Sequence, residues 1–130
     1  MSVIEDTLRE FGRSIGMEDL RLRDDGTLVL DMQQVGTLAV ELIGERREDV
    51  SLSLSRGIQP PDETACARLL EMCHYRNPCA WPVRTGLTSS GTLIFAIRLE
   101  AFDFTLPNLH QALDWLDGLH QQSSAFVGPA

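Results

Sequence analysis

The sequence contains no lysine, few aromatic residues and no long apolar run. All 11 basic residues are arginines, against 19 Asp and Glu, so the formal net charge of the 130-residue chain is −8. Nucleic-acid binding needs clustered positive charge, so we expect no nucleic-acid partner. The best apolar stretch, Thr92–Leu99, is broken by Arg98. Because a membrane span needs roughly 20 apolar residues, we expect no membrane insertion.

The N-terminus lacks the features of a secretory signal. It carries Glu5 and Asp6 where such a signal has basic residues followed by an apolar block. The sequence therefore predicts a cytoplasmic protein, in which Cys66, Cys73 and Cys79 are reduced thiols. Cys66 and Cys73 lie about 10 Å apart on a predicted helix, at 1.5 Å rise per residue, which is too far for a disulfide.

Residue patterns for catalysis and for metal or cofactor binding are missing. His110 and His120 point about 80° apart on one predicted helix, and we expect both at the surface or its rim. The spacing of Cys73, His74 and Cys79 matches no zinc motif, which favours packing cysteines. Glycines are too sparse for a phosphate loop, and no lysine could serve one. We therefore expect no catalytic residue, no metal site, no cofactor and no enzymatic activity.

Apolar periodicity predicts one α+β domain. Ser51–Ser55 reads Ser-Leu-Ser-Leu-Ser, the alternation of a strand with one apolar face. Ser2, Asp62 and Thr105 are expected helix caps. Helices are predicted at 3–15, 62–75 and 106–121, and strands at 27–32, 35–43, 50–56, 83–87 and 92–99. The order α-β-β-β-α-β-β-α predicts an antiparallel sheet with three helices, in a single domain at 1–122 followed by a flexible tail at 123–130.

Several short motifs, together with this order of elements, resemble one known family. Residues 11–16, Phe-Gly-Arg-Ser-Ile-Gly, are similar to the Phe-Gly-x-x-Leu-Gly end of the first helix in class I type III secretion chaperones, the family of CesT and SycE. Residues 24–26, Asp-Asp-Gly, precede a predicted strand and are similar to the turn that leads into the first hairpin of this family. Residues 104–113 are similar to the start of the last helix in SycN-type members. The resemblance covers about residues 3–122.

The resemblance implies a dimer whose subunits have three helices and a five-stranded twisted sheet. Such a chaperone has no ATPase activity and holds the N-terminal chaperone-binding segment of a secreted effector or gatekeeper protein, the client, in a soluble and secretion-competent form. SycN-type members work as a heterodimer with a second small chaperone, whereas a family-level likeness implies a homodimer. The alternative function is that of an anti-activator or another regulatory protein-binding module of the secretion system.

Two sets of apolar residues are candidate contact surfaces. A client strand can add to a sheet edge while pockets take its apolar side chains. The candidate client-binding residues are Leu8, Phe11, Leu28, Leu30, Leu38, Val40, Leu52 and Leu54. The wide apolar stripe of the second helix suggests a dimer interface at Leu69, Met72 and Cys73. Both sets have an alternative role as the core of a single chain, because apolar burial stabilises any fold.

Overall fold

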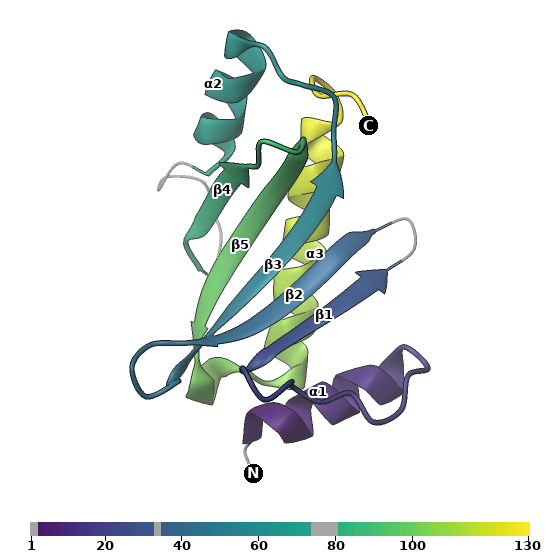
Figure 1. Cartoon of the computed structure of the whole chain (residues 1–130), viewed down its shortest axis with the longest axis vertical. Helices are drawn as coiled ribbons and strands as arrows, with labels where there is room; N and C mark the ends of the chain where they lie inside the picture. The colour runs from purple at the N-terminus through teal and green to yellow at the C-terminus, as the bar shows by residue number, and fades with distance from the viewer. Residues whose placement is uncertain (1–2, 33–34, 74–80) are drawn as a thin grey trace.

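The computed structural model describes residues 3–32, 35–73 and 81–130 (Figure 1). Within these ranges the helices are α1 (Val3–Ser14), α2 (Glu63–Met72), α3 (Leu106–Ser123) and the short 3-10 helix η1 (Ala101–Asp103), and the strands are β1 (Thr27–Met32), β2 (Gly36–Ile43), β3 (Asp49–Gly57), β4 (Val83–Leu87) and β5 (Thr92–Glu100). The predicted element order and the α+β class are confirmed. The short helix η1 was not predicted.

Capping side chains start the second and third helices where the sequence predicts. The Asp62 carboxylate accepts a hydrogen bond from the Ala65 amide at 2.8 Å, and the Thr105 hydroxyl accepts one from the Asn108 amide at 3.3 Å. These bonds satisfy amides that have no partner inside the helix. The expected cap of α1, Ser2, lies outside the described residues.

The five strands form one antiparallel sheet in the order β1-β2-β3-β5-β4. β1, β2 and β3 follow one another as hairpins, and β5 pairs with β3 after the chain has passed through α2 and β4 (Figure 1). This connection leaves β1 and β4 as the two edge strands. Strand alternation gives the sheet one apolar face and one mixed face.

The apolar face of the sheet carries the core. Leu52 and Leu54 of β3 and Phe95 of β5 are fully buried. α3 lies against this face, behind the sheet in Figure 1, and contacts β3 and β5. α1 packs against α3 and η1, where the Thr7 hydroxyl donates to the Phe104 carbonyl at 3.1 Å.

A buried histidine ties α3 to the sheet. His120 is 3% exposed, and its Nε2 donates to the Leu54 carbonyl at 2.7 Å. Its ring meets the Phe95 ring edge-on, with 4.8 Å between centroids. The surface position predicted for His120 is therefore wrong, because the ring has an acceptor inside the core. Burial lowers the pKa of His120, although the Leu54 hydrogen bond opposes the shift.

The chain beyond α3 packs onto the domain. α3 continues to Ser123, so the predicted domain boundary at 122 falls inside a helix. Val127 is only 5% exposed and belongs to the core cluster. The Ala130 amide donates to the Gly57 carbonyl at 3.3 Å. Flexibility of residues 123–130 stays a prediction, but their contacts with the domain were not foreseen.

Candidate binding surfaces

The eight predicted client-binding residues lie in the core of the single chain. The exposed fraction is 1% or less for Leu8, Phe11, Leu38, Val40, Leu52 and Leu54, and 8% for Leu28 and Leu30. The last two retain some exposure because β1 is an edge strand. All eight belong to one apolar cluster, in agreement with the core alternative. A direct contact between these side chains and a client stays a prediction.

The three predicted dimer residues also face their own chain. Leu69 is 2% exposed, and Met72 and Cys73 pack against the core. Burial raises the pKa of the Cys73 thiol and so favours its neutral form. The apolar side chain that α2 presents outward is Leu70, which is 68% exposed. The role of the three residues in a dimer stays a prediction.

The second face of the sheet carries small and polar side chains. Val29, Ala39, Ser53, Ala96 and Arg84 lie side by side across all five strands, in the order β1-β2-β3-β5-β4. We call this surface the open face, because none of the described helices covers it; it faces the viewer in Figure 1. The side chains at its centre are short, whereas the longer side chain of Val29, at one edge, is 45% exposed.

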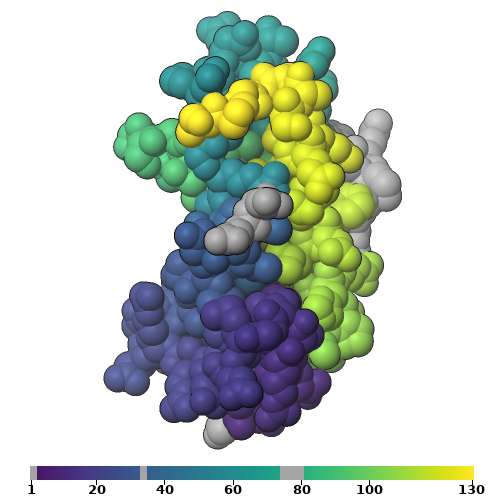
Figure 2. Space-filling model, turned by 90° about the vertical axis from the view of Figure 1, so that its right-hand side faces the viewer, coloured from purple at the N-terminus to yellow at the C-terminus, as the bar shows by residue number. Residues whose placement is uncertain are grey.

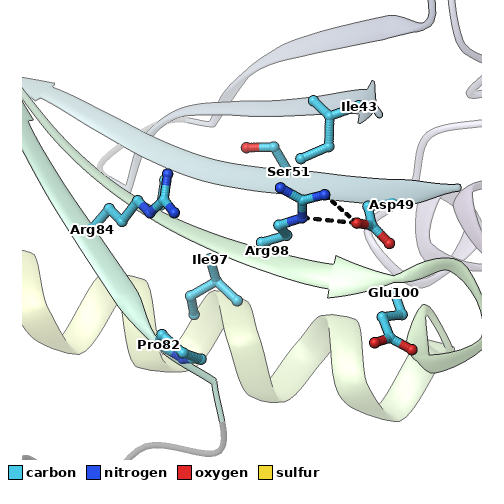
Figure 3. Close-up of a pocket in the computed structure, with 9 residues that line it drawn as sticks. Ile43, Asp49, Ser51, Pro82, Arg84, Ile97, Arg98 and Glu100 are labelled. Carbon is cyan, nitrogen blue, oxygen red and sulfur yellow. Dashed lines mark hydrogen bonds and ion pairs between the residues drawn. The ribbon is translucent and has the colours of Figure 1, made fainter. Parts of the chain in front are cut away.

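A charged hollow of about 340 Å³ lies at the β4 end of the open face (Figure 3). The Nε of Arg98 donates to Oδ2 of Asp49 at 2.8 Å, so that arginine is held by a carboxylate. Arg84 of β4 lies on the same face and is exposed, and Glu100 and Ser51 complete the polar lining. A guanidinium offers several donors and a fixed charge, so this hollow can hold a polar or acidic side chain of a partner.

The outer edge of β1 offers unpaired backbone groups. The Thr27 carbonyl accepts a hydrogen bond from the Arg23 amide at 2.7 Å, on the side away from β2. Because alternate residues of an antiparallel strand point to the same side, Val29 and Asp31 also direct their backbone groups outward. This edge can therefore pair with an added strand.

An apolar hollow of about 210 Å³ lies between α2 and β4. Its lining consists of Cys66, Leu69, Leu70, Thr85, Gly86 and Leu87. Leu70 and Leu87 are 68% and 44% exposed. The Thr85 hydroxyl is buried without a hydrogen-bond partner in the described part of the chain. An apolar surface with an unsatisfied hydroxyl is suited to contact with another protein.

The described residues contain no group of three or more side chains placed to hold a metal ion. Cys66 and Cys73 are free thiols, whereas His74 and Cys79 lie outside the described residues. Within the same ranges, no helix combines the length and apolar character that a bilayer crossing requires.

Solved structures identify the class of fold. A chain in the structure of the ExsC–ExsE complex matches with a TM-score of 0.77 over 97% of both chains, at 20% identity. The structure of the Yersinia pestis type III secretion chaperone SycH in complex with a stable fragment of YscM2 matches with a TM-score of 0.71, at 15% identity, over 95% of this chain and 99% of the other. The chain therefore has a fold found in type III secretion chaperones.

Sequence comparison defines the family within that class. The family model described as type III secretory system chaperone SycN matches residues 3–124. The chaperone protein SycN of Yersinia enterocolitica is 29% identical over 123 residues, which are 94% of this chain and 97% of the relative. The chain belongs to the SycN family of type III secretion chaperones, as its resemblance at the sequence level predicts.

Sequence reasoning missed the residues that stand on the surfaces just described. Val29 alternates with two core leucines, so strand periodicity alone places it on the opposite face. Arg98 interrupts the apolar run of its strand, which indicates a solvent-facing side. The pairing of Arg98 with Asp49 depends on the register of β3 and β5, and no local signal predicts it.

Proposed function

We propose that the chain binds the N-terminal chaperone-binding segment of a secreted effector or gatekeeper protein and keeps that segment soluble and competent for secretion. The match of the SycN family model to residues 3–124 is the observation that carries this proposal. Further support comes from SycH, a type III secretion chaperone solved in complex with a fragment of YscM2. The chain acts by binding, without catalysis, in the cytoplasm.

The client segment adds as an extended strand to the outer edge of β1. The outward backbone groups of Val29 and Asp31 give main-chain hydrogen bonds that are independent of client sequence. Exposed Val29 offers apolar contact on the open face. Leu28 and Leu30 retain 8% exposure on the other face of the same strand and contact alternate client side chains.

A second chaperone subunit covers the hollow between α2 and β4. Leu70 and Leu87 are its most exposed apolar residues, and their burial between subunits would be favourable. The charge of −8 disfavours non-specific self-association. The second subunit is either another copy of this chain or a different small chaperone.

Co-expression with a secreted protein encoded beside this chain tests client binding. We expect the client's N-terminal segment to be soluble and to co-purify only when the chain is present. Val29→Asp is expected to weaken this complex at least about tenfold, because a charge would be desolvated at the strand edge. The matched control is Val3→Asp, which adds the same charge at a residue that is 69% exposed on α1.

Two results would contradict the proposal. A client segment that stays soluble and uncomplexed in the presence of the chain would exclude the chaperone role. Stable binding to a regulator of secretion genes, without binding to any secreted protein, would favour the regulatory alternative. Equal client affinity of Val29→Asp and Val3→Asp would remove the β1 edge from the binding site while leaving the chaperone role intact.

A further inference from the structure

The charged hollow on the open face carries opposite charges at its two ends. Arg84 of β4 and Glu100 of β5 line it, and both side chains are exposed. Arg84 pairs in register with Ala96, and Glu100 lies four residues further along β5. At about 3.3 Å per strand residue, the two positions are about 13 Å apart along the strand. Figure 3 shows Arg84 and Glu100 at opposite ends of the hollow, with the Arg98–Asp49 ion pair between them.

The ion pair in the middle leaves both ends uncompensated. The Nε and Nη2 of Arg98 both donate to Oδ2 of Asp49, so this arginine and this carboxylate neutralise each other. Asp49 also lies directly opposite Glu100 in the register of β3 and β5, where two like charges repel. In the part of the chain that the structure describes, Arg84 and Glu100 have no ion-pair partner. Each can therefore pair with a charge on another molecule.

The space between the two ends has room for a polypeptide. Ala96 and Ser51, which line the hollow, have short side chains, and Ile43 adds apolar contact area. A small carboxylate ligand would compensate only Arg84 and would leave Glu100 unpaired. A chain that carries an acidic and a basic residue compensates both ends at once, through charge-assisted hydrogen bonds. The hollow therefore fits a charged stretch of a protein better than a small molecule.

The open face leads from the proposed client edge to this hollow. Figure 2 views the molecule from the β1 side, with α3 along the right of the view and the strands to its left, and the open face is the side of the sheet turned away from α3. β1 and β5 are separated by three strand spacings, about 14 Å at about 4.8 Å each. An extended chain crosses this distance in about four or five residues. A client segment paired with β1 can therefore continue into the hollow.

We propose that the charged hollow binds an extended stretch of the client that carries an acidic residue and, four residues away, a basic one. This inference rests on the function proposed above. The acidic side chain pairs with Arg84 and the basic one with Glu100. Alternate side chains of an extended chain point to the same side, so residues i and i+4 face the hollow together and lie about 13 Å apart. A helix would need about nine residues to span the same distance, so the spacing identifies the bound conformation.

Charge reversal at either end tests whether the hollow contacts the client. The probe is the client's N-terminal segment from the co-expression experiment, titrated into the purified full chain. Arg84→Glu and Glu100→Arg are each expected to weaken its binding at least about tenfold, because like charges would then face each other across the contact. Arg13→Glu makes the same change as Arg84→Glu at an exposed residue near the end of α1 and should bind as the unchanged chain does.

Compensating reversals in the client test the spacing. Each acidic residue of the client segment is replaced by arginine and each basic residue by glutamate, one at a time. One acidic position is expected to restore binding to Arg84→Glu, and one basic position, four residues from it, is expected to restore binding to Glu100→Arg. Restoring positions that lie about nine residues apart, as in a helix, or no restoring position at all, would overturn the proposal.

Failure of this inference is distinguishable from failure of the chaperone role. Undiminished client binding by both reversed variants would exclude the hollow and leave the chaperone role intact, whereas no binding by the unchanged chain would contradict both. A lower mass of Arg84→Glu in light scattering, with client affinity unchanged, would assign the hollow to the contact between subunits and overturn the inference. If circular dichroism shows that a reversed variant does not fold, Arg84→Gln or Glu100→Gln replaces it and should weaken client binding about two- to fivefold.

Discussion

At the scale of the residue, His120 couples the stability of the fold to pH. Its pKa is lowered by burial, so below about pH 6.5 the unfolded chain binds more protons than the folded chain does. Stability is then complete above that pH and falls as the pH drops toward the lowered folded value. Part of this fall also reflects carboxylates, so a variant must separate the two contributions.

We expect thermal unfolding curves to show this contribution directly. Between about pH 7.5 and pH 5.5 the melting temperature of the unchanged chain should fall more than that of His120→Gln, which has no imidazole to protonate. The glutamine amide can still donate to the Leu54 carbonyl. Parallel curves for the two proteins would show that His120 does not titrate differently in the two states.

Substitution of Leu54 tests whether this residue belongs to the core or to a client-binding pocket. It is fully buried, so Leu54→Ala should lower the free energy of unfolding by about 2–5 kcal/mol. Leu54→Glu is expected to lose the folded state, rather than client affinity alone. Val29→Ala, at a 45% exposed position, should change stability by no more than about 0.5 kcal/mol. Denaturant titration measures both, and a mild effect of Leu54→Ala would reopen the pocket assignment.

At the scale of the element, α2 depends on its first residues. The Asp62 carboxylate satisfies the Ala65 amide at 2.8 Å, and Asp62→Ala should cost about 1 kcal/mol. Asp114→Ala, at an exposed position within α3, removes a charge without removing a cap and serves as the control. Chemical denaturation followed by circular dichroism measures the difference, and equal stabilities would mean that α2 starts without this cap.

At the scale of the whole molecule, we propose that the surface between α2 and β4 forms the contact between subunits. Light scattering of the purified chain should give about twice the chain mass if it forms a homodimer, the commonest closed assembly. Leu70→Asp is expected to reduce that mass to a monomer, because a charge would enter the apolar interface without a partner. Val3→Asp, at a similarly exposed residue far from α2, should leave the mass unchanged.

A monomeric or aggregating chain would indicate a missing second chaperone. The same two variants are then measured together with that subunit, and Leu70→Asp should again abolish the complex. A mass unaffected by Leu70→Asp, alone or with the second subunit, would move the interface away from α2.

Element types followed from sequence because each depends on local patterns. The alternation of Ser51–Ser55 and the caps at Asp62 and Thr105 define strands and helix starts without long-range information. Local patterns did not predict equally well which face of each helix or strand is buried. Leu69 and Leu70 are neighbours on α2, and which of them is buried depends on how the helix lies against the sheet.

Candidate contact residues were harder to predict for a physical reason. A leucine in an amphipathic strand has the same sequence pattern whether it fills the core or lines a pocket. His120 and Val127 became buried through contacts with residues distant in sequence, Leu54 and the core cluster. Such contacts exist only after the sheet has formed, so periodicity could not indicate them.

The short side chains of the open face lower the conformational entropy that is lost when a partner covers it. Ala39, Ser53 and Ala96 have short side chains, which lose little rotational freedom when a surface covers them. A partner laid across this floor therefore meets groups that are already fixed by the backbone ladder beneath them. The residues that discriminate between partners would then be the two at the ends of this row of side chains. These are Val29, with its isopropyl group, and Arg84, with its guanidinium, which lie on opposite edge strands. Partners would be sorted by the distance between their own apolar and acidic groups.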